Sequence, residues 1–352
     1  MNMTQTRYIK AAFLAIVAAS ISACQWTEPE NLDYTRVPFE QADPEGYEAY
    51  LQGVKKYKKS SHNITLLMMD GTSDFPSSQS QRIMSMPDSA DFICVNSPAG
   101  LHPEIVGEIA VVEAKKETKV ISHVDFSIAE NLWLDLKNSR ADAGQPEPTE
   151  QECKAFFKQN AEKQLALCSD LGFKGVLVSY ESLNSTKEGF IARDAFMNAV
   201  NSWKLSHIDA ILVLRGNIAL LKDFKQVLSM CDYMVLILGG QSGTPSYIAH
   251  INAHMSQIPY KNKLLLEVTV PNADNPEQIG DSAYKAARNI LSKDIQEYEP
   301  YKVLGLVVSN AADDYFNENY FAENDIKNEK PIHFGSFVNV RRAIGVFASK
   351  QN

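Results

Sequence analysis

Glu181 is the residue whose type and position best suit acid–base chemistry. It directly follows the apolar run Gly175–Tyr180, and a carboxyl group there can donate a proton to a ligand that the fold brings near. Other polar residues stand in or at the ends of apolar runs: Asp70, Asn96, Asp125, Ser179, Tyr180, Arg215, Gln241, Glu267 with Asn272, and Asn310. So many polar ends suit a ligand of the size and polarity of a sugar. Loops also begin at these points and are polar in most proteins, which explains most of the pattern without a ligand.

The sequence has no pattern typical of a metal site or of an activated nucleophile. Four cysteines follow the N-terminal region: Cys94, Cys153, Cys168 and Cys231. They form no CxxC pair and have no histidine at ligand spacing, so we expect buried free thiols, although an exported protein could form a disulfide. His123 and His207 are interpreted as packing residues. Since HExxH and Ser-His-Asp spacings are also absent from the sequence, we expect no metal and no cofactor.

The elements that must position the polar ends are eight short apolar runs that alternate with helical patterns. The runs are Ile64–Met69, Asp91–Val95, Lys119–Val124, Gly175–Tyr180, Ala210–Leu214, Tyr233–Leu238, Leu264–Val270 and Val303–Val308. Apolar residues at helical spacing predict helices at Glu45–Lys59, Pro103–Lys116, Glu150–Leu171, Ile191–Leu205, Ala219–Met230, Ser246–Gln257, Asp281–Asp294 and Phe337–Ala348. After the third run the chain continues in a longer and more polar connection through Trp133, and the Pro-rich stretch 145–149 in it is expected to be a surface loop.

This alternation predicts an α/β fold. Runs that are apolar throughout are typical of parallel strands buried on both faces, and eight of them with helices between indicate a single-domain (β/α)8 TIM barrel over residues 44–352. The carboxyl ends of its strands would then meet at one face. An open doubly wound sheet is the alternative. Its nucleotide-binding form is not favoured, because Met69-Asp70-Gly71-Thr72-Ser73 follows the first run instead of a glycine-rich turn.

The fourth run resembles the fourth-strand motif of glycoside hydrolase family 18, the chitinases and endo-β-N-acetylglucosaminidases. That motif is DGxDxDxE with an aromatic residue before the Glu, and the chain has KGVLVSYE at 174–181. The glycine, the aromatic residue and the acid are kept, while Lys174, Leu177 and Ser179 replace the three Asp. The segment Asp232–Gly240 is similar to the endoglycosidase sixth-strand pattern DYVxxQxYGG, with leucines in place of its Gln and Tyr.

The resemblance implies a degenerate catalytic site with Glu181 as a vestigial acid. In the family, this Glu protonates the glycosidic oxygen while the substrate's N-acetyl group attacks the anomeric carbon. The preceding Asp orients that group and stabilises its developing positive charge. Ser179 cannot supply that charge, and Leu177 cannot join a proton network. Losing one preorganised contact commonly costs about 3–4 kcal/mol of transition-state stabilisation.

The N-terminus has the features of an exported lipoprotein. Residues 1–23 have a charged start and a short apolar stretch, and Ile21-Ser22-Ala23-Cys24 resembles the lipobox, whose Cys carries the lipid anchor. Residues 24–43 are acidic and Pro-containing, as expected of a flexible tether. Glu28 and Glu30 are similar to the surface-export signals of Bacteroidetes lipoproteins. We therefore expect a lipoprotein of the outer membrane, exposed on the cell surface or facing the periplasm.

Three functions stay open on the sequence. The first is a non-catalytic glycan-binding protein that presents oligosaccharide, an N-acetylglucosamine-containing glycan among the candidates, to outer-membrane sugar-importer components in polysaccharide utilisation. The second is a weak endo-β-N-acetylglucosaminidase or chitinase that uses Glu181, and the third is a protein-interaction scaffold. A net charge of -9 argues against a nucleic-acid partner, because phosphate binding needs a basic surface.

Overall fold

The computed structural model describes residues 39–272, 280–319 and 336–349. The predicted signal segment, Cys24 and the predicted tether up to residue 38 lie outside them. The chain divides into two compact units, residues 1–50 and 51–352. The first contains helix α2, Phe39–Ala42, and the start of helix α3, Pro44–Lys59. The description of the structure below concerns the second unit.

Eight parallel strands close into a barrel in the order in which they occur in the chain. They are β1 Ile64–Asp70, β2 Phe92–Asn96, β3 Lys119–Asp125, β4 Gly175–Tyr180, β5 Ile211–Gly216, β6 Tyr233–Ile237, β7 Leu264–Val268 and β8 Val303–Val308. Each predicted run overlaps one of these strands to within two residues at either end, and β8 pairs with β1 to complete the ring. The predicted (β/α)8 barrel is confirmed, and the open sheet is excluded.

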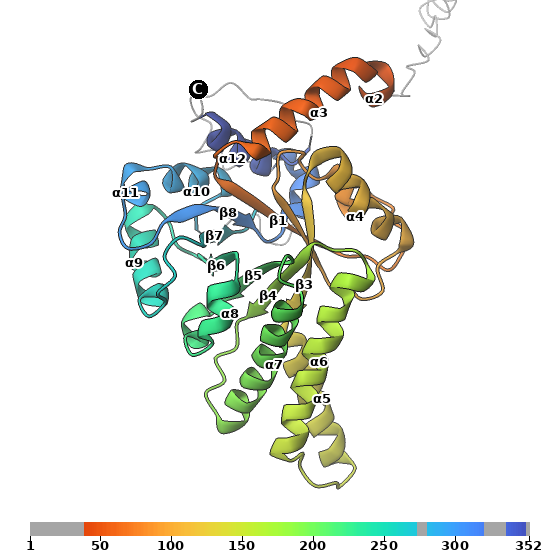
Figure 1. Cartoon of the computed structure of the whole chain (residues 1–352), viewed down its shortest axis with the longest axis vertical. Coiled ribbons are helices and arrows are strands. Elements are labelled where there is room, and N and C mark those ends of the chain that lie inside the picture. Colours follow the sequence, from red (N-terminus) through yellow and green to blue (C-terminus); the bar gives the residue numbers. More distant parts are fainter. Residues whose placement is uncertain (1–38, 273–279, 320–335, 350–352) are drawn as a thin grey trace, which may run out of the picture. The chain divides into compact units, whose positions relative to one another are not determined.

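Helices surround the strands (Figure 1). They are α4 Pro103–Lys116, α5 Phe126–Asp142, α6 Glu150–Asp170, α7 Lys187–Ser206, α8 Lys225–Met230, α9 Thr244–Met255, α10 Ala283–Ile290, α11 Lys293–Gln296 and α12 Val338–Ser349. Short 3₁₀ turns occupy Gln79–Gln81, Ile83–Ser85, Ile218–Leu221 and Ala311–Asn319. The predicted helix at Ala219–Met230 is thus a turn followed by α8, and the one at Asp281–Asp294 ends early and is followed by α11.

Helix α5 corrects the prediction of a polar connection through Trp133. The carboxylate of Asp125 caps the helix by accepting from the backbone N–H of Ser127 at 2.8 Å. Its apolar residues do not form one buried stripe, because Leu132 and Leu134 are 47% and 52% exposed while Trp133 is buried. That distribution hides the helical period. The surface loop predicted at residues 145–149 is confirmed.

Side chains along each strand alternate between the barrel interior and the layer under the helices. The interior is filled by a cluster that includes Leu66, Cys94, Leu177, Val213 and Leu265. Their neighbours in sequence pack outward in a larger cluster under the helices. The four cysteines at 94, 153, 168 and 231 are buried and free, as predicted.

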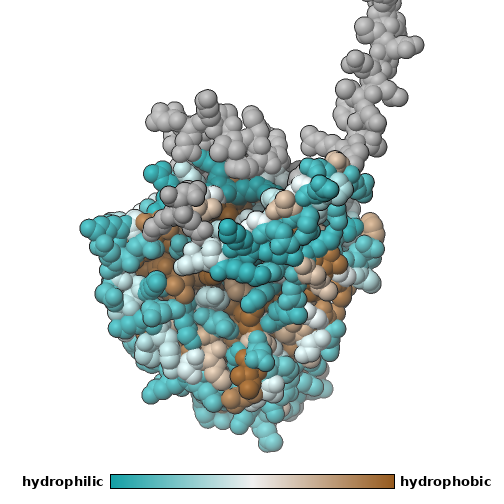
Figure 2. Space-filling view, turned by 45° about the horizontal axis from the view of Figure 1, so that its top comes forward, coloured by the Kyte–Doolittle hydropathy of each residue, from teal (hydrophilic) through white to brown (hydrophobic). Residues whose placement is uncertain are grey.

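The molecular surface seen in Figure 2 is mostly hydrophilic, with hydrophobic patches between the hydrophilic regions. No helix within the described residues has the length and apolar character needed to cross a bilayer.

Candidate functional site

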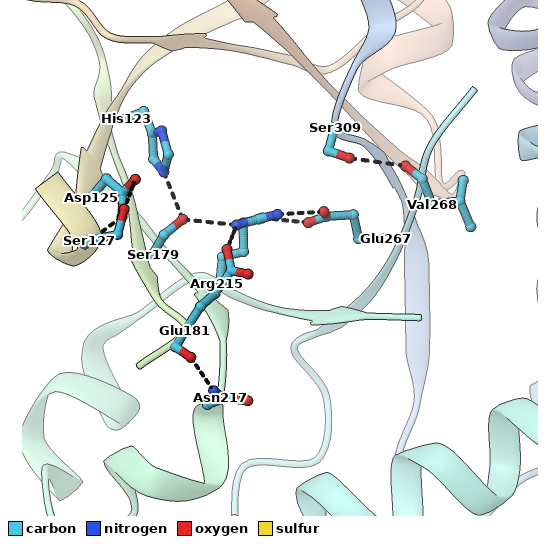
Figure 3. A network of polar contacts seen from close by, with 10 residues as sticks. All are labelled: His123, Asp125, Ser127, Ser179, Glu181, Arg215, Asn217, Glu267, Val268 and Ser309. Carbon is cyan, nitrogen blue, oxygen red and sulfur yellow. Dashed lines mark hydrogen bonds and ion pairs between the residues drawn. The ribbon is translucent and has the colours of Figure 1, made fainter. Parts of the chain in front are cut away.

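The strand alternation brings a set of polar side chains together at the carboxyl end of the barrel. Three of these side chains face the barrel interior, because each follows an interior apolar residue by two positions in its strand. They are Ser179 after Leu177, Arg215 after Val213, and Glu267 after Leu265. Figure 3 shows them converging from β4, β5 and β7, with Glu181 just beyond β4. In a (β/α)8 barrel this end is the one that carries ligand sites.

Arg215 lies at the centre of the cluster. Its Nε and Nη2 donate to Oε2 and Oε1 of Glu267 at 2.6 and 2.7 Å, which is a bidentate ion pair. Its Nη1 contacts Oε1 of Glu181 and lies 3.3 Å from Oγ of Ser179. One guanidinium therefore contacts both Glu181, which occupies the acid position of the family 18 motif, and Ser179, which occupies the position of the last Asp in that motif.

Burial makes these charges depend on one another. The side chains of Arg215 and Glu267 are 12% and 3% exposed, whereas that of Glu181 is 52% exposed. Burial alone would lower the pKa of Arg215, but its hydrogen bonds and charge contacts with Glu267 and Glu181 raise that pKa above its ordinary value. Arg215 is thus held as a fixed cation between a buried carboxylate and an accessible one.

His123 extends the network on the side of β3. Its Nε2 lies 2.7 Å from Oγ of Ser179. Burial lowers the pKa of His123 to about 4, with the carboxylate of Asp125 opposing the shift and Arg215 adding to it. The imidazole is therefore neutral at pH 7 and forms a neutral hydrogen bond with the serine hydroxyl.

Gly216 shapes the backbone beside Glu181. Its φ is +102°, and a Cβ there would lie 2.5 Å from the carbonyl oxygen of Tyr180 and 2.9 Å from Cγ of Glu181. Only glycine adopts this conformation without strain and leaves that space. Asn217 then donates through Nδ2 to the carbonyl oxygen of Glu181 at 2.7 Å, which fixes the residue from the β5 side.

Two further predicted residues form a pair at the same end of the barrel. Asp70 and Asn96 are register partners on β1 and β2, and Nδ2 of Asn96 donates to Oδ1 of Asp70 at 3.0 Å. Asp125 is on the same strand as His123, but its carboxylate is engaged in capping α5. Asp70, Glu181 and Glu267 thus bring three carboxyl groups to this end of the barrel, together with the guanidinium of Arg215.

The structure assigns three other predicted residues to packing or loop geometry. Tyr180 is buried and points outward, 4.9 Å from the ring of Phe126 between centroids. Asn310 makes two hydrogen bonds with the backbone of Val270, at 2.7 and 2.9 Å. The side-chain oxygen of Gln241 accepts from the hydroxyl of Ser246 at the start of α9. Each of these three side chains is therefore engaged in contacts within the protein.

The sixth strand also differs from its sequence interpretation. Leu236 and Leu238 belong to the outer core, while Val235 belongs to the interior cluster. Ile237 shares the face of Val235, so it is the residue that β6 turns towards the site. The leucines that replace polar residues in the family pattern therefore do not line the mouth.

His123 is a network residue that sequence reasoning missed. It was interpreted as packing, although it stands two residues before Asp125 and so shares its face of β3. Arg215 was recognised only as one polar strand end among several. Its contacts with both Glu181 and Glu267 arise only because the closed barrel brings the ends of β4, β5 and β7 together.

A cavity lies at the end of the barrel opposite to the polar network. Its volume is about 540 Å³, and its lining includes Ile64, Phe92 and Tyr233 near the amino ends of β1, β2 and β6. Because these residues are at the far ends of the strands from Arg215, the cavity is separate from the polar network. Within the described residues, no cluster of three or more His, Cys, Asp or Glu could hold a metal ion.

Comparisons with known proteins come from sequence and from structure. The family model of glycoside hydrolase family 18, BT1044-like, matches residues 27–323. No curated protein matches the chain. An endo-β-N-acetylglucosaminidase of Cordyceps militaris in its apo form has 15% identity and a TM-score of 0.53, covering 85% of this chain and 95% of that one.

Two further solved structures are similar to the same extent. A variant of the Cordyceps militaris endo-β-N-acetylglucosaminidase in complex with fucosyl-N-acetylglucosamine-Asn has 15% identity and a TM-score of 0.57, with 85% and 95% of the two chains covered. A selenomethionine variant of BT1044 has 14% identity and a TM-score of 0.56, with 87% and 94% covered. At such identities the likeness shows a shared barrel fold.

Proposed function

Because the chain belongs to glycoside hydrolase family 18, in its BT1044-like group, we propose that it is a glycan-binding member that does not cleave its ligand. The observation that carries this proposal is the contact of Arg215 with Glu181. A general acid must present a proton to the glycosidic oxygen, and here the guanidinium engages an oxygen of the carboxyl group in the acid position. Beside it stand Ser179 and Leu177, where the family has carboxylates.

The remaining groups at the mouth are suited to binding. Glu181, Asp70 and Asn96 offer carboxylate and amide groups, which can accept or donate hydrogen bonds to sugar hydroxyls. The complex of the Cordyceps militaris variant with fucosyl-N-acetylglucosamine-Asn supports an N-acetylglucosamine-containing glycan as the ligand. The Arg215–Glu267 ion pair then gives the site a rigid support, since both groups are buried and their charges neutralise each other.

The proposal includes a location and partners. A lipid on Cys24 would anchor the protein to the outer membrane, and residues 24–43 would let the barrel reach glycans at the cell surface. A tethered binder of this kind would deliver oligosaccharide to a sugar importer. The support for this part is the N-terminal sequence.

The test combines turnover with affinity. The purified barrel is incubated with chitin oligosaccharides and with N-glycopeptides, products are followed by mass spectrometry, and affinities are measured by calorimetry. We expect measurable binding, no product above background, and only a modest change in affinity for Glu181→Gln, because the amide keeps the shape of the carboxyl group. Robust cleavage that is lost in Glu181→Gln would overturn the proposal.

A weak hydrolase is the second candidate, and the exposure of Glu181 favours it, since half of that side chain is open to a ligand. It predicts slow product formation that Arg215→Met changes and Glu181→Gln abolishes. A protein-interaction scaffold predicts no affinity for any glycan in the same experiment.

A further inference from the structure

A smaller cavity lies on the flank of the barrel, next to the mouth. Its volume is about 210 Å³, and its walls come from α5, α6, the loop between β4 and α7, and the start of α7. Phe157 and Trp133 contribute to the lining and are only 1% and 4% exposed. The cavity is smaller than those that hold drug-sized ligands and suits a group the size of one sugar ring.

A polar network holds this cavity in shape. The indole N–H of Trp133 donates to Oε1 of Glu188 at 2.8 Å, and Nζ of Lys137 donates to Oε2 of the same carboxylate at 2.8 Å. Although partial burial opposes it, these two hydrogen bonds lower the pKa of Glu188 below its ordinary value. The carboxylate, the ammonium and the indole are therefore fixed before any ligand arrives.

Two lining residues on α5 have their side chains available to a ligand. Leu134 is 52% exposed and presents an apolar edge. Asn131 is exposed, and no hydrogen bond within the described residues engages its amide, so a donor and an acceptor are both free. An apolar edge beside free amide groups matches a pyranose ring, whose C–H face is apolar and whose rim carries hydroxyls.

The cavity lies close to the mouth, because the segment after β4 contributes residues to both. Ser182 follows Glu181 directly, and its hydroxyl donates to Oε1 of Glu130 at 2.6 Å. Glu130 and Asn184 both line the cavity. Glu181 and Asn184 are three residues apart, so their backbones are separated by at most about 11 Å. A short oligosaccharide can span such a distance.

We propose that this cavity is an accessory subsite that holds an outlying sugar unit of a glycan whose main part occupies the mouth. The inference rests on the proposed glycan-binding function and adds a site outside the barrel interior. It predicts that long glycans gain affinity from α5 and that short ones do not.

The experiment compares short and long ligands on matched variants. The short probes are the chitin disaccharide and fucosyl-N-acetylglucosamine-Asn, and the long probes are the chitin hexasaccharide and a complete N-glycopeptide. Asn131→Ala and Leu134→Ala change the lining. Asn138→Ala and Leu132→Ala are the controls, because they change the same residue types on the same helix outside it. Affinities are measured by calorimetry on the full barrel.

We expect Asn131→Ala and Leu134→Ala each to weaken the long probes by about 5-fold to 10-fold and to leave short probes and controls unchanged. The indole N–H resonance of Trp133 should shift with long probes and not with short ones. Equal affinity of all variants for the long probes, with binding intact, overturns the subsite and leaves the proposed function standing. Absence of binding by the unmutated protein to every probe overturns both.

Discussion

Arg215→Met tests whether the buried ion pair at the mouth is organised as described. The substitution keeps most of the length of the side chain and removes its charge. Glu267, which is 3% exposed, then loses both of its guanidinium hydrogen bonds. Breaking a buried pair by removing one partner typically costs about 3–5 kcal/mol of unfolding free energy, because a charge is left buried without compensation. For the unit of about 300 residues, this corresponds to a fall in Tm of roughly 5 to 8 °C.

The companion variant removes both charges. Arg215→Met combined with Glu267→Leu leaves no buried carboxylate at this position, so we expect most of the lost stability to return. Lys187→Met is the control, since it breaks an ion pair with Glu150 in which the two side chains are 78% and 63% exposed. Such exposed pairs contribute less than about 1 kcal/mol.

The assay is urea unfolding at pH 7 followed by circular dichroism, with fluorescence to check that both probes give one transition. A loss below about 1 kcal/mol for Arg215→Met would refute the account, because it would mean that water or a rearranged side chain already compensates Glu267. A double variant no more stable than the single one would refute the assignment of the loss to an unpaired carboxylate.

Three other predictions can be checked independently. Gly216→Ala should destabilise the barrel by about 1–3 kcal/mol in the same unfolding assay, because φ is +102° and the new Cβ meets a carbonyl oxygen, whereas Gly107→Ala on α4 should be neutral or stabilising. His62 contacts Asp91 at 2.7 Å, and this hydrogen bond raises the pKa of His62 above 6.5. Its contribution to stability, measured against His62→Gln, should be complete below pH 6.5 and lost as pH rises through the raised pKa; a contribution that grows with pH would contradict this. Cys24→Ala should move the protein from the membrane to the soluble fraction, and unchanged fractionation would exclude the lipid anchor.

The architecture of the barrel could be predicted because it depends on local patterns. Most strands contain a continuous apolar segment, such as Leu66–Met69 or Val176–Val178, and such segments require burial on both faces wherever they lie in the fold. Helix α5 could not be recognised in the same way. Its capping residue Asp125 was interpreted as a ligand group, and its exposed leucines removed the amphipathic period on which the prediction depended.

The candidate site was predicted only in part. Glu181, Ser179 and Glu267 do meet at the mouth, as positions at strand ends must in a closed barrel. Tyr180 does not, since it follows an inward residue and so points to the helices. Asn310 and Gln241 end strands as well, but their amide groups hold nearby segments of the chain.

The sequence by itself determined the strand order, the family motif and the loss of two of its carboxylates at Leu177 and Ser179, because these are properties of single positions along the chain. Only the tertiary structure decided what replaces them. Arg215 lies 34 residues from Glu181 and 52 from Glu267, and its guanidinium reaches both because the barrel closes. No local pattern encodes a contact between three strands, so the partner of the residue in the acid position could be identified only in the folded barrel.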